Sequence, residues 1–144
     1  MLIDLLLLFG ISLLAATLLP IGSEALLLYD LSQGYNPYLL VTFATIGNTL
    51  GSVINYFLGY KGVDFLIRKK YANQKKLTDA SVIFKKYGAY SLLLSWVPII
   101  GDPITFIAGV MKYEIKKFII IVFIAKGVRY TIVTLIYLKS LTLS

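Results

Sequence analysis

The chain contains no cysteine and no histidine among its 144 residues. It can therefore form no disulfide, no zinc site built on thiolate or imidazole, and no Ser-His-Asp triad. Its first 60 residues also lack lysine and arginine. Because a cleaved signal peptide needs a basic segment before its apolar core, we expect the amino-terminal segment to be retained. We expect no metal, no cofactor and no enzyme active site.

Apolar residues are abundant instead. They make up 58% of the chain, whereas about half is usual for a soluble domain, and the mean hydropathy is +0.83. The length permits one domain, residues 1–144, and the hydropathy places that domain in a membrane. The sequence therefore predicts an all-α integral membrane protein.

Four apolar blocks follow one another: residues 2–31, 38–60, 88–111 and 118–138. The second and fourth blocks are continuous and long enough to span a bilayer, which takes about 20 residues. The first and third blocks are interrupted by proline and glycine at 20–23 and 98–103. We expect each of these two blocks to form a re-entrant helical hairpin. A full span by residues 2–19 is the alternative.

The two interrupted blocks share a pattern at an offset of 78 residues. Pro20-Ile21-x-x-Glu24 matches Pro98-Ile99-x-x-Asp102, and the same offset lays residues 38–60 on 118–138. Identities are few, so a chance match is the alternative. Paired interrupted segments of this kind are typical of transporters with inverted repeats. The pattern predicts two inverted repeats, residues 2–60 and 88–139, joined by residues 61–87.

The joining segment is strongly basic. Residues 61–86 hold eight of the fourteen Lys and Arg residues. Nucleic-acid binding is one reading, but in so apolar a chain we expect none, because cytoplasmic loops of membrane proteins concentrate these residues. Apolar residues recur there at helical spacing, which predicts an amphipathic helix with its apolar side on the bilayer; a solvated loop is the alternative. Residues 61–86 and 111–117 are then cytoplasmic, and both termini face outward.

Each interruption carries an acidic residue. After Pro20 and Gly22 stop the first helix, Ser23 is placed to cap a second one with Glu24 in its first turn. These two half-helices would meet within the membrane, where irregular backbone needs protein or a water-filled cavity around it. The alternative is a pair of solvated caps at the bilayer surface.

The second interruption reads Gly101-Asp102-Pro103, after Pro98. This order predicts Asp102 at the N-cap with proline at the first helical position. Two half-helix N-termini would give the cavity a positive backbone field, which suits an anion or an acid that changes protonation.

The fourth block carries two cations, Lys126 and Arg129, on one helix face. Such groups are costly in a membrane unless paired, so pairing with Glu24 and Asp102 is expected. Arg129 could also hold a phosphate through two hydrogen bonds; a purely structural ion-pair network is the alternative.

The second block carries Gly47 and Gly51, whose spacing favours close helix packing. Asn48 and Asn55 lie on related turns, and we count both as candidate cavity-lining residues.

These motifs resemble the DedA family of membrane proteins (SNARE-associated or VTT domain), in particular its small YqaA-like branch. The resemblance covers nearly the whole chain and rests on these stretches: "PIGSE" (20–24), "GNTLGSVINYFLGYKG" (47–62), "SWVPIIGDP" (95–103), "AG" (108–109) and "KGVRY" (126–130). It implies an inverted-repeat fold with two re-entrant hairpins in the bacterial inner membrane. It also implies translocation of polyprenyl-phosphate carriers or phospholipids linked to the proton-motive force, with lipid scrambling in eukaryotic relatives.

The chain departs from the mainstream family pattern at four places. Ala15 and Ala16 stand where a further glutamate is usual, Ser52 replaces an acid, and Ser95 and Gly101 replace arginines that flank the second proline. The resemblance therefore carries over only Glu24, while Asp102 and Arg129 belong to this branch.

Together these observations predict a lipid flippase or scramblase that handles anionic or phosphate-bearing lipids with protons, alone or as a homo-oligomer. A carrier of small solutes coupled to protons or cations, and a membrane scaffold that transports nothing, are the alternatives. An intramembrane aspartyl protease built on Asp30 and Asp102 is a further one, disfavoured because Asp30 lies beside the polar turn at 34–37.

Overall fold

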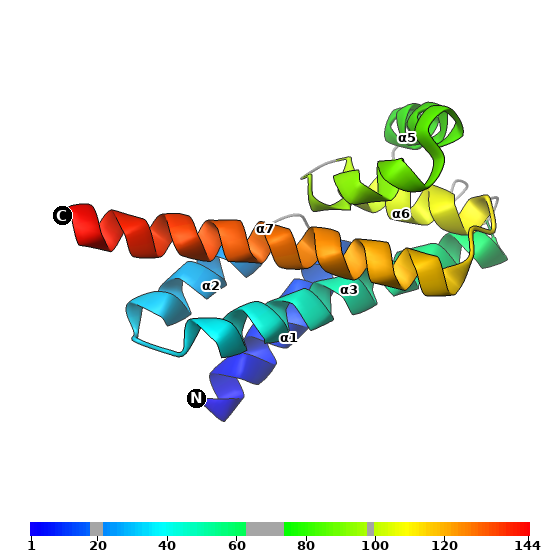
Figure 1. Ribbon diagram of the computed structural model, residues 1–144. Coiled ribbons are helices and arrows are strands. Elements are labelled where there is room, and N and C mark those ends of the chain that lie inside the picture. The colour runs from blue at the N-terminus through cyan, green and yellow to red at the C-terminus, as the bar shows by residue number, and fades with distance from the viewer. Residues whose placement is uncertain (18–21, 63–73, 98–99) are drawn as a thin grey trace.

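The computed structural model describes residues 1–17, 22–62, 74–97 and 100–144. Every regular element within these ranges is a helix (Figure 1), which confirms the predicted all-α class. In chain order the elements are α1 (Leu2–Thr17), α2 (Ser23–Ser32), α3 (Pro37–Lys61), α5 (Gln74–Tyr87), the 3-10 helix η1 (Gly88–Trp96), α6 (Gly101–Val110) and α7 (Ile115–Leu143).

Two helices are long and apolar enough to cross a membrane, α3 with 25 residues and α7 with 29. At about 1.5 Å per residue both exceed the hydrocarbon thickness of about 30 Å. They contain the predicted spans 38–60 and 118–138. In contrast, α2 and α6 have 10 residues each, about 15 Å, and are too short to cross.

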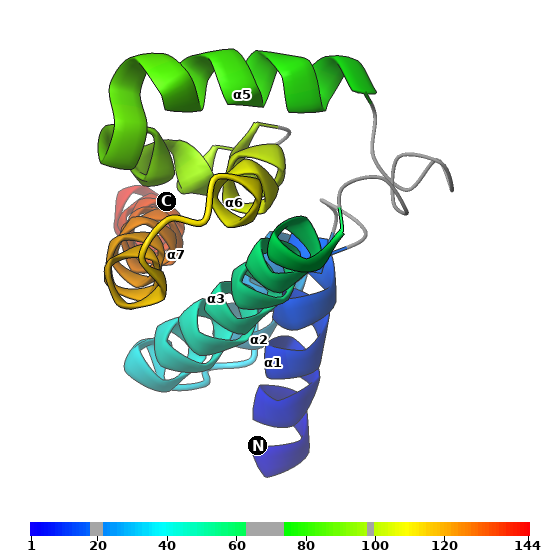
Figure 2. The same cartoon turned by 90° about the vertical axis from the view of Figure 1, so that its right-hand side faces the viewer.

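The two long helices α3 and α7 run lengthwise through the molecule, whereas α5 lies across their direction (Figure 1 and Figure 2). Both termini and the α2–α3 turn lie at one end, whereas the last residues of α3 and the α6–α7 turn lie at the other. Apolar side chains form two buried clusters. One joins α1, α2, α3 and α7 around Leu8, Leu27 and Leu40, and the other joins α3, α5, η1, α6 and α7 around Leu92 and Phe118.

Element boundaries recur at the offset seen in the sequence. Adding 78 to the bounds of α2 gives the bounds of α6, and adding 78 to the first residue of α3 gives the first residue of α7. The two connecting turns share backbone angles as well. Gln33 and Met111 have φ −79°, and both Gly34 (φ 81°) and Lys112 (φ 52°) take the left-handed conformation. The same order of elements therefore occurs twice: a helix, a short helix, a turn and a long helix. The turn has the same backbone conformation both times.

Glycines let the helices approach closely, as the spacing of Gly47 and Gly51 predicts. A Cβ atom on Gly47 would stand 2.3 Å from the Phe9 carbonyl oxygen, and one on Gly51 would stand 2.4 Å from that of Leu13. Real Cβ atoms keep at least 3.0 Å, so only glycine allows α1 to lie this near to α3. This contact holds the first helix pair on the long helix α3.

The basic segment differs from its prediction. Of residues 61–87, the structure describes 61–62 and 74–87, and the second of these ranges is the helix α5. Figure 2 shows α5 running across α6. Its apolar residues Ala80 and Phe84 are buried in the second cluster, and the Phe84 and Tyr113 rings form a T-shaped pair. The apolar face therefore packs against the protein, and the expectation that it rests on the bilayer is wrong for these two residues.

Candidate functional site

The first interruption places Glu24 in the opening turn of α2. Gly22, with φ 116°, takes a conformation that favours glycine, and the helix begins at Ser23. The predicted cap by Ser23 is wrong, because the N-cap residue is Gly22, which has no side chain, and Ser23 is already the first helical residue. The Ser23 hydroxyl donates instead to Glu24 Oε2 at 3.2 Å. Pro20 lies outside the described residues.

The second interruption places Asp102 in the opening turn of α6. Ile100 is at the N-cap, Gly101 is the first helical residue, and Pro103 follows within the first turn. The prediction of Asp102 at the N-cap is therefore wrong by two positions. Gly101 is needed here, because a Cβ atom would stand 2.3 Å from the Ser95 carbonyl oxygen. Pro98 lies outside the described residues.

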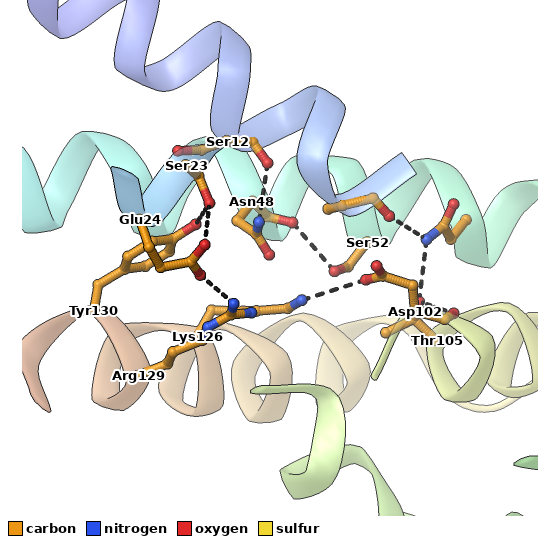
Figure 3. A network of polar contacts seen from close by, with 12 residues as sticks. Ser12, Ser23, Glu24, Asn48, Ser52, Asp102, Thr105, Lys126, Arg129 and Tyr130 are labelled. Carbon is orange, nitrogen blue, oxygen red and sulfur yellow. Dashed lines mark hydrogen bonds and ion pairs between the residues drawn. The ribbon is translucent and has the colours of Figure 1, made fainter. Parts of the chain in front are cut away.

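Each of these acids meets one cation from α7 (Figure 3). Glu24 Oε1 pairs with the Arg129 guanidinium, and Asp102 Oδ1 lies 3.5 Å from Lys126 Nζ. The Lys126 side chain is only 2% exposed and that of Arg129 is 17% exposed. The structure thus brings the four predicted charged residues together from α2, α6 and α7. Residues of α1, α3 and η1 surround these four side chains.

A cavity of about 10 Å³ lies between the two ion pairs, enough for about one water molecule. Its lining comprises Ala15, Ser23, Glu24, Asn48, Ser95, Val97, Asp102, Lys126 and Arg129. Besides the ion-paired Glu24 Oε1, two lining atoms, Asn48 Oδ1 and Ser95 Oγ, are buried and have no hydrogen-bond partner within the described part of the chain. A cavity with charged walls and unsatisfied acceptors is suited to a polar guest.

The two asparagines of α3 hold the end of α1. Asn48 Nδ2 donates to the Ser12 carbonyl at 3.0 Å, and Asn55 Nδ2 donates to the Ala16 carbonyl at 2.6 Å. Asn48 therefore both packs and lines the cavity. Asn55 is absent from the cavity lining, and among the described residues its contacts are those of helix packing.

Sequence reasoning missed Tyr130. Its ring is completely buried, and its hydroxyl donates to Ser23 Oγ at 3.0 Å, which extends a hydrogen-bonded chain to Glu24 (Figure 3). The signal was available, because Tyr130 follows Lys126 by four residues and shares its helix face. However, Tyr130 is one of eleven tyrosines, and tyrosine in a membrane protein is common at the membrane interface, so its residue type alone does not indicate burial.

The acids of the disfavoured protease alternative do not share the cavity. Asp30 is buried near the end of α2 and is not part of the lining that contains Asp102. Asp102 faces Lys126 rather than a second aspartate.

The fold and the site define a class: a helical membrane protein in which two short helices carry acids to cations on a long apolar helix, a candidate membrane span. The VTT domain family matches residues 19–138. Since this covers most of the chain, the chain belongs to the VTT-domain, or DedA, family.

Relatives agree with this assignment. The chain is 41% identical over 127 residues to the inner membrane protein YqaA of Escherichia coli, covering 88% of this chain and 85% of the relative. It is 34% identical over 135 residues to a protein of Haemophilus influenzae, with 88% and 82% covered. No solved structure matches the chain. The chain is an integral protein of the inner membrane, and α3 and α7 are its candidate spans.

Proposed function

We propose that the chain translocates a phosphate-bearing lipid, a polyprenyl phosphate or a phospholipid, across the inner membrane with the help of protons. The observation that carries this proposal is Arg129, mostly buried in a spanning helix and paired with Glu24 beside a polar cavity. A guanidinium fork suits phosphate oxygens as well as carboxylates. Membership of the family supports a transport role, and so do the sequence stretches that this chain shares with the family.

In this proposal, α1–α2 and η1–α6 are re-entrant hairpins inserted from opposite faces, as inverted repeats. The short length of α2 and α6 and the shared turn geometry support this arrangement. The cytoplasmic side is the end that carries α5 and residues 111–117, because Lys and Arg concentrate there and are absent from residues 1–60. The charged cluster then lies where the two hairpins meet.

A lipid fits this site better than a small free solute does. The α7 residues Ile120, Ile124, Val128 and Ile132 are exposed over the same turns of the helix that carry both cations, on the face turned away from the buried Lys126. Acyl chains can remain in the bilayer against that surface while the head group enters between the helices. Dependence of transport on the lipid tail separates this proposal from a small-solute carrier.

The test uses Glu24→Gln and Asp102→Asn in purified protein reconstituted into liposomes. Each amide variant leaves one cation without its carboxylate partner, so its free energy of unfolding should fall by about 3 kcal/mol or less. The melting temperature in detergent is therefore measured beside transport to show that each variant folds. Each should lose at least about tenfold in translocation of a fluorescent phosphate-bearing lipid, a barrier change of about 1.4 kcal/mol. Glu114→Gln, at the exposed pair with Lys117, is the control. Wild-type rates in both amide variants would contradict the proposed role of these acids.

A further inference from the structure

The charged cluster is electrically balanced. Glu24 and Asp102 supply two negative charges, while Lys126 and Arg129 supply two positive charges, and each cation has one carboxylate partner. Within the described ranges, the other helices that line the cavity beside Glu24 add no charge: α3 contributes Asn48, α1 contributes Ala15 and η1 contributes Ser95. An added anion would therefore leave the cluster with a net negative charge in a medium that penalises it.

Glu24 uses both of its carboxylate oxygens. Oε1 pairs with Arg129, and Oε2 accepts from Ser23, whose own oxygen accepts from Tyr130. A phosphate can be held in the same place, with two of its oxygens on the guanidinium fork and a hydrogen bond from the neighbouring hydroxyl. The cavity beside it has room for about one water molecule, so a phosphate group does not fit while Glu24 keeps its place.

We infer that the Glu24 carboxylate is a built-in competitor of the substrate phosphate for Arg129, and that the lipid binds by displacing it. This inference rests on the proposed function, because it concerns the same site. The Asp102–Lys126 pair remains formed in this step. In this structure the Glu24 carboxylate stands where the phosphate would bind.

Displacement has a consequence for protons. A carboxylate removed from Arg129 within the membrane is unpaired, so it takes up one proton from water and becomes a neutral carboxylic acid. No bond in the lipid changes, and the cluster stays balanced because one negative charge replaces another. The ionisable groups that face Glu24 among the described residues are Arg129, Lys126 and Tyr130 from α7 and Asp102 from α6. Lipid binding therefore consumes one proton for each Glu24 displaced.

The experiment measures binding of dihexanoyl phosphatidylglycerol to the purified full chain in uncharged alkyl maltoside micelles by calorimetry. A phosphodiester lacks the second ionisation of a phosphomonoester at pKa about 6, so the ligand charge stays constant. Titrations run from about pH 6 to pH 8, above the usual carboxyl range. Neutral dihexanoylglycerol and chain-free glycerophosphoglycerol are the comparison ligands. Glu24→Gln is the test variant, and Glu114→Gln is its control.

Wild type and Glu114→Gln should bind about tenfold more weakly for each unit rise in pH, the linkage expected for uptake of one proton. Glu24→Gln should bind more tightly at pH 8, with the pH dependence lost. Unchanged affinity and slope in Glu24→Gln would overturn the inference and leave the proposed function standing. If wild type binds the neutral glyceride or the chain-free head group as well as it binds phosphatidylglycerol, the proposed function itself fails.

Discussion

Lys126 and Arg129 lie near the middle of α7, where a lone helix would have to bury two charges in lipid. Insertion scales place the cost of one such residue at about 2.5–3.5 kcal/mol. The protein offsets this cost by aiming one acid at each cation from the opening turns of α2 and α6. Acids in these turns also interact favourably with the helix dipole, which contributes a smaller amount. The two ion pairs therefore explain how the cations are stabilised in α7. Glu24 and Arg129 remain partly exposed, which is compatible with the displacement of Glu24 inferred above.

Removing Arg129 tests the pairing at this scale. Arg129→Ala leaves Glu24 without its cation, so the free energy of unfolding should fall by about 3 kcal/mol or less, since breaking a fully buried pair costs about 3–5 and these side chains are partly exposed. Adding Glu24→Gln should restore most of the loss. Thermal unfolding in detergent measures both. Lys117→Ala, at the exposed pair with Glu114, should change the melting temperature little. A double variant no more stable than Arg129→Ala would show that the pair is not the source of the loss.

The residue types of the site could be predicted from sequence, but their partners could not. Acids next to helix breaks and cations inside an apolar segment can be recognised from the sequence alone, because charged residues are unusual in such apolar surroundings. Which acid meets which cation depends on how α2 and α6 approach α7, and that follows from packing. Tyr130 and Ser95 were missed because tyrosine and serine are ordinary residues until their burial is known.

At the scale of elements, the contact of α1 with α3 depends on glycine at chosen positions. Gly51→Ala should destabilise the protein by about 1–3 kcal/mol, because its Cβ atom would overlap the Leu13 carbonyl and the Ala16 side chain. Gly10→Ala, in α1 with nothing within 4 Å, is the matched control and should stabilise by up to about 1 kcal/mol through helix propensity. The melting temperatures of the two variants are compared with that of the wild type. Equal shifts in the same direction would contradict the close packing of α1 against α3 at Gly51.

Element positions were predicted well where a hydrophobic run or a turn marks them. The spans and the α2–α3 and α6–α7 turns were found within a few residues. The two caps and the apolar face of α5 were not. Ser23 and Asp102 have the residue types of caps, yet nearby side chains offer their oxygens better partners. An amphipathic pattern shows that one face is apolar, but it does not tell whether lipid or α6 covers that face.

At the scale of the whole molecule, the proposed topology places α5 and the chain's end on opposite sides of the membrane. The absence of native cysteine allows single cysteines at Lys85 and Ser144, both exposed. A membrane-impermeant thiol reagent added outside spheroplasts should label Ser144→Cys, and it should label Lys85→Cys only after the membrane is opened. If both cysteines are labelled from the same side, the proposed inverted orientation of the two repeats is contradicted.

The most direct test of the account compares Arg129→Lys with wild type in liposomes, with translocation of a phosphate-bearing lipid as the readout and melting temperature as the check on folding. Lysine keeps the charge, so its pairing with Glu24 and the fold should persist, but it lacks the planar fork that grips two phosphate oxygens. The account predicts a variant with nearly wild-type stability and at least about tenfold slower translocation, a barrier change of about 1.4 kcal/mol. A lysine variant that translocates the lipid at the wild-type rate would contradict the phosphate-binding role of Arg129.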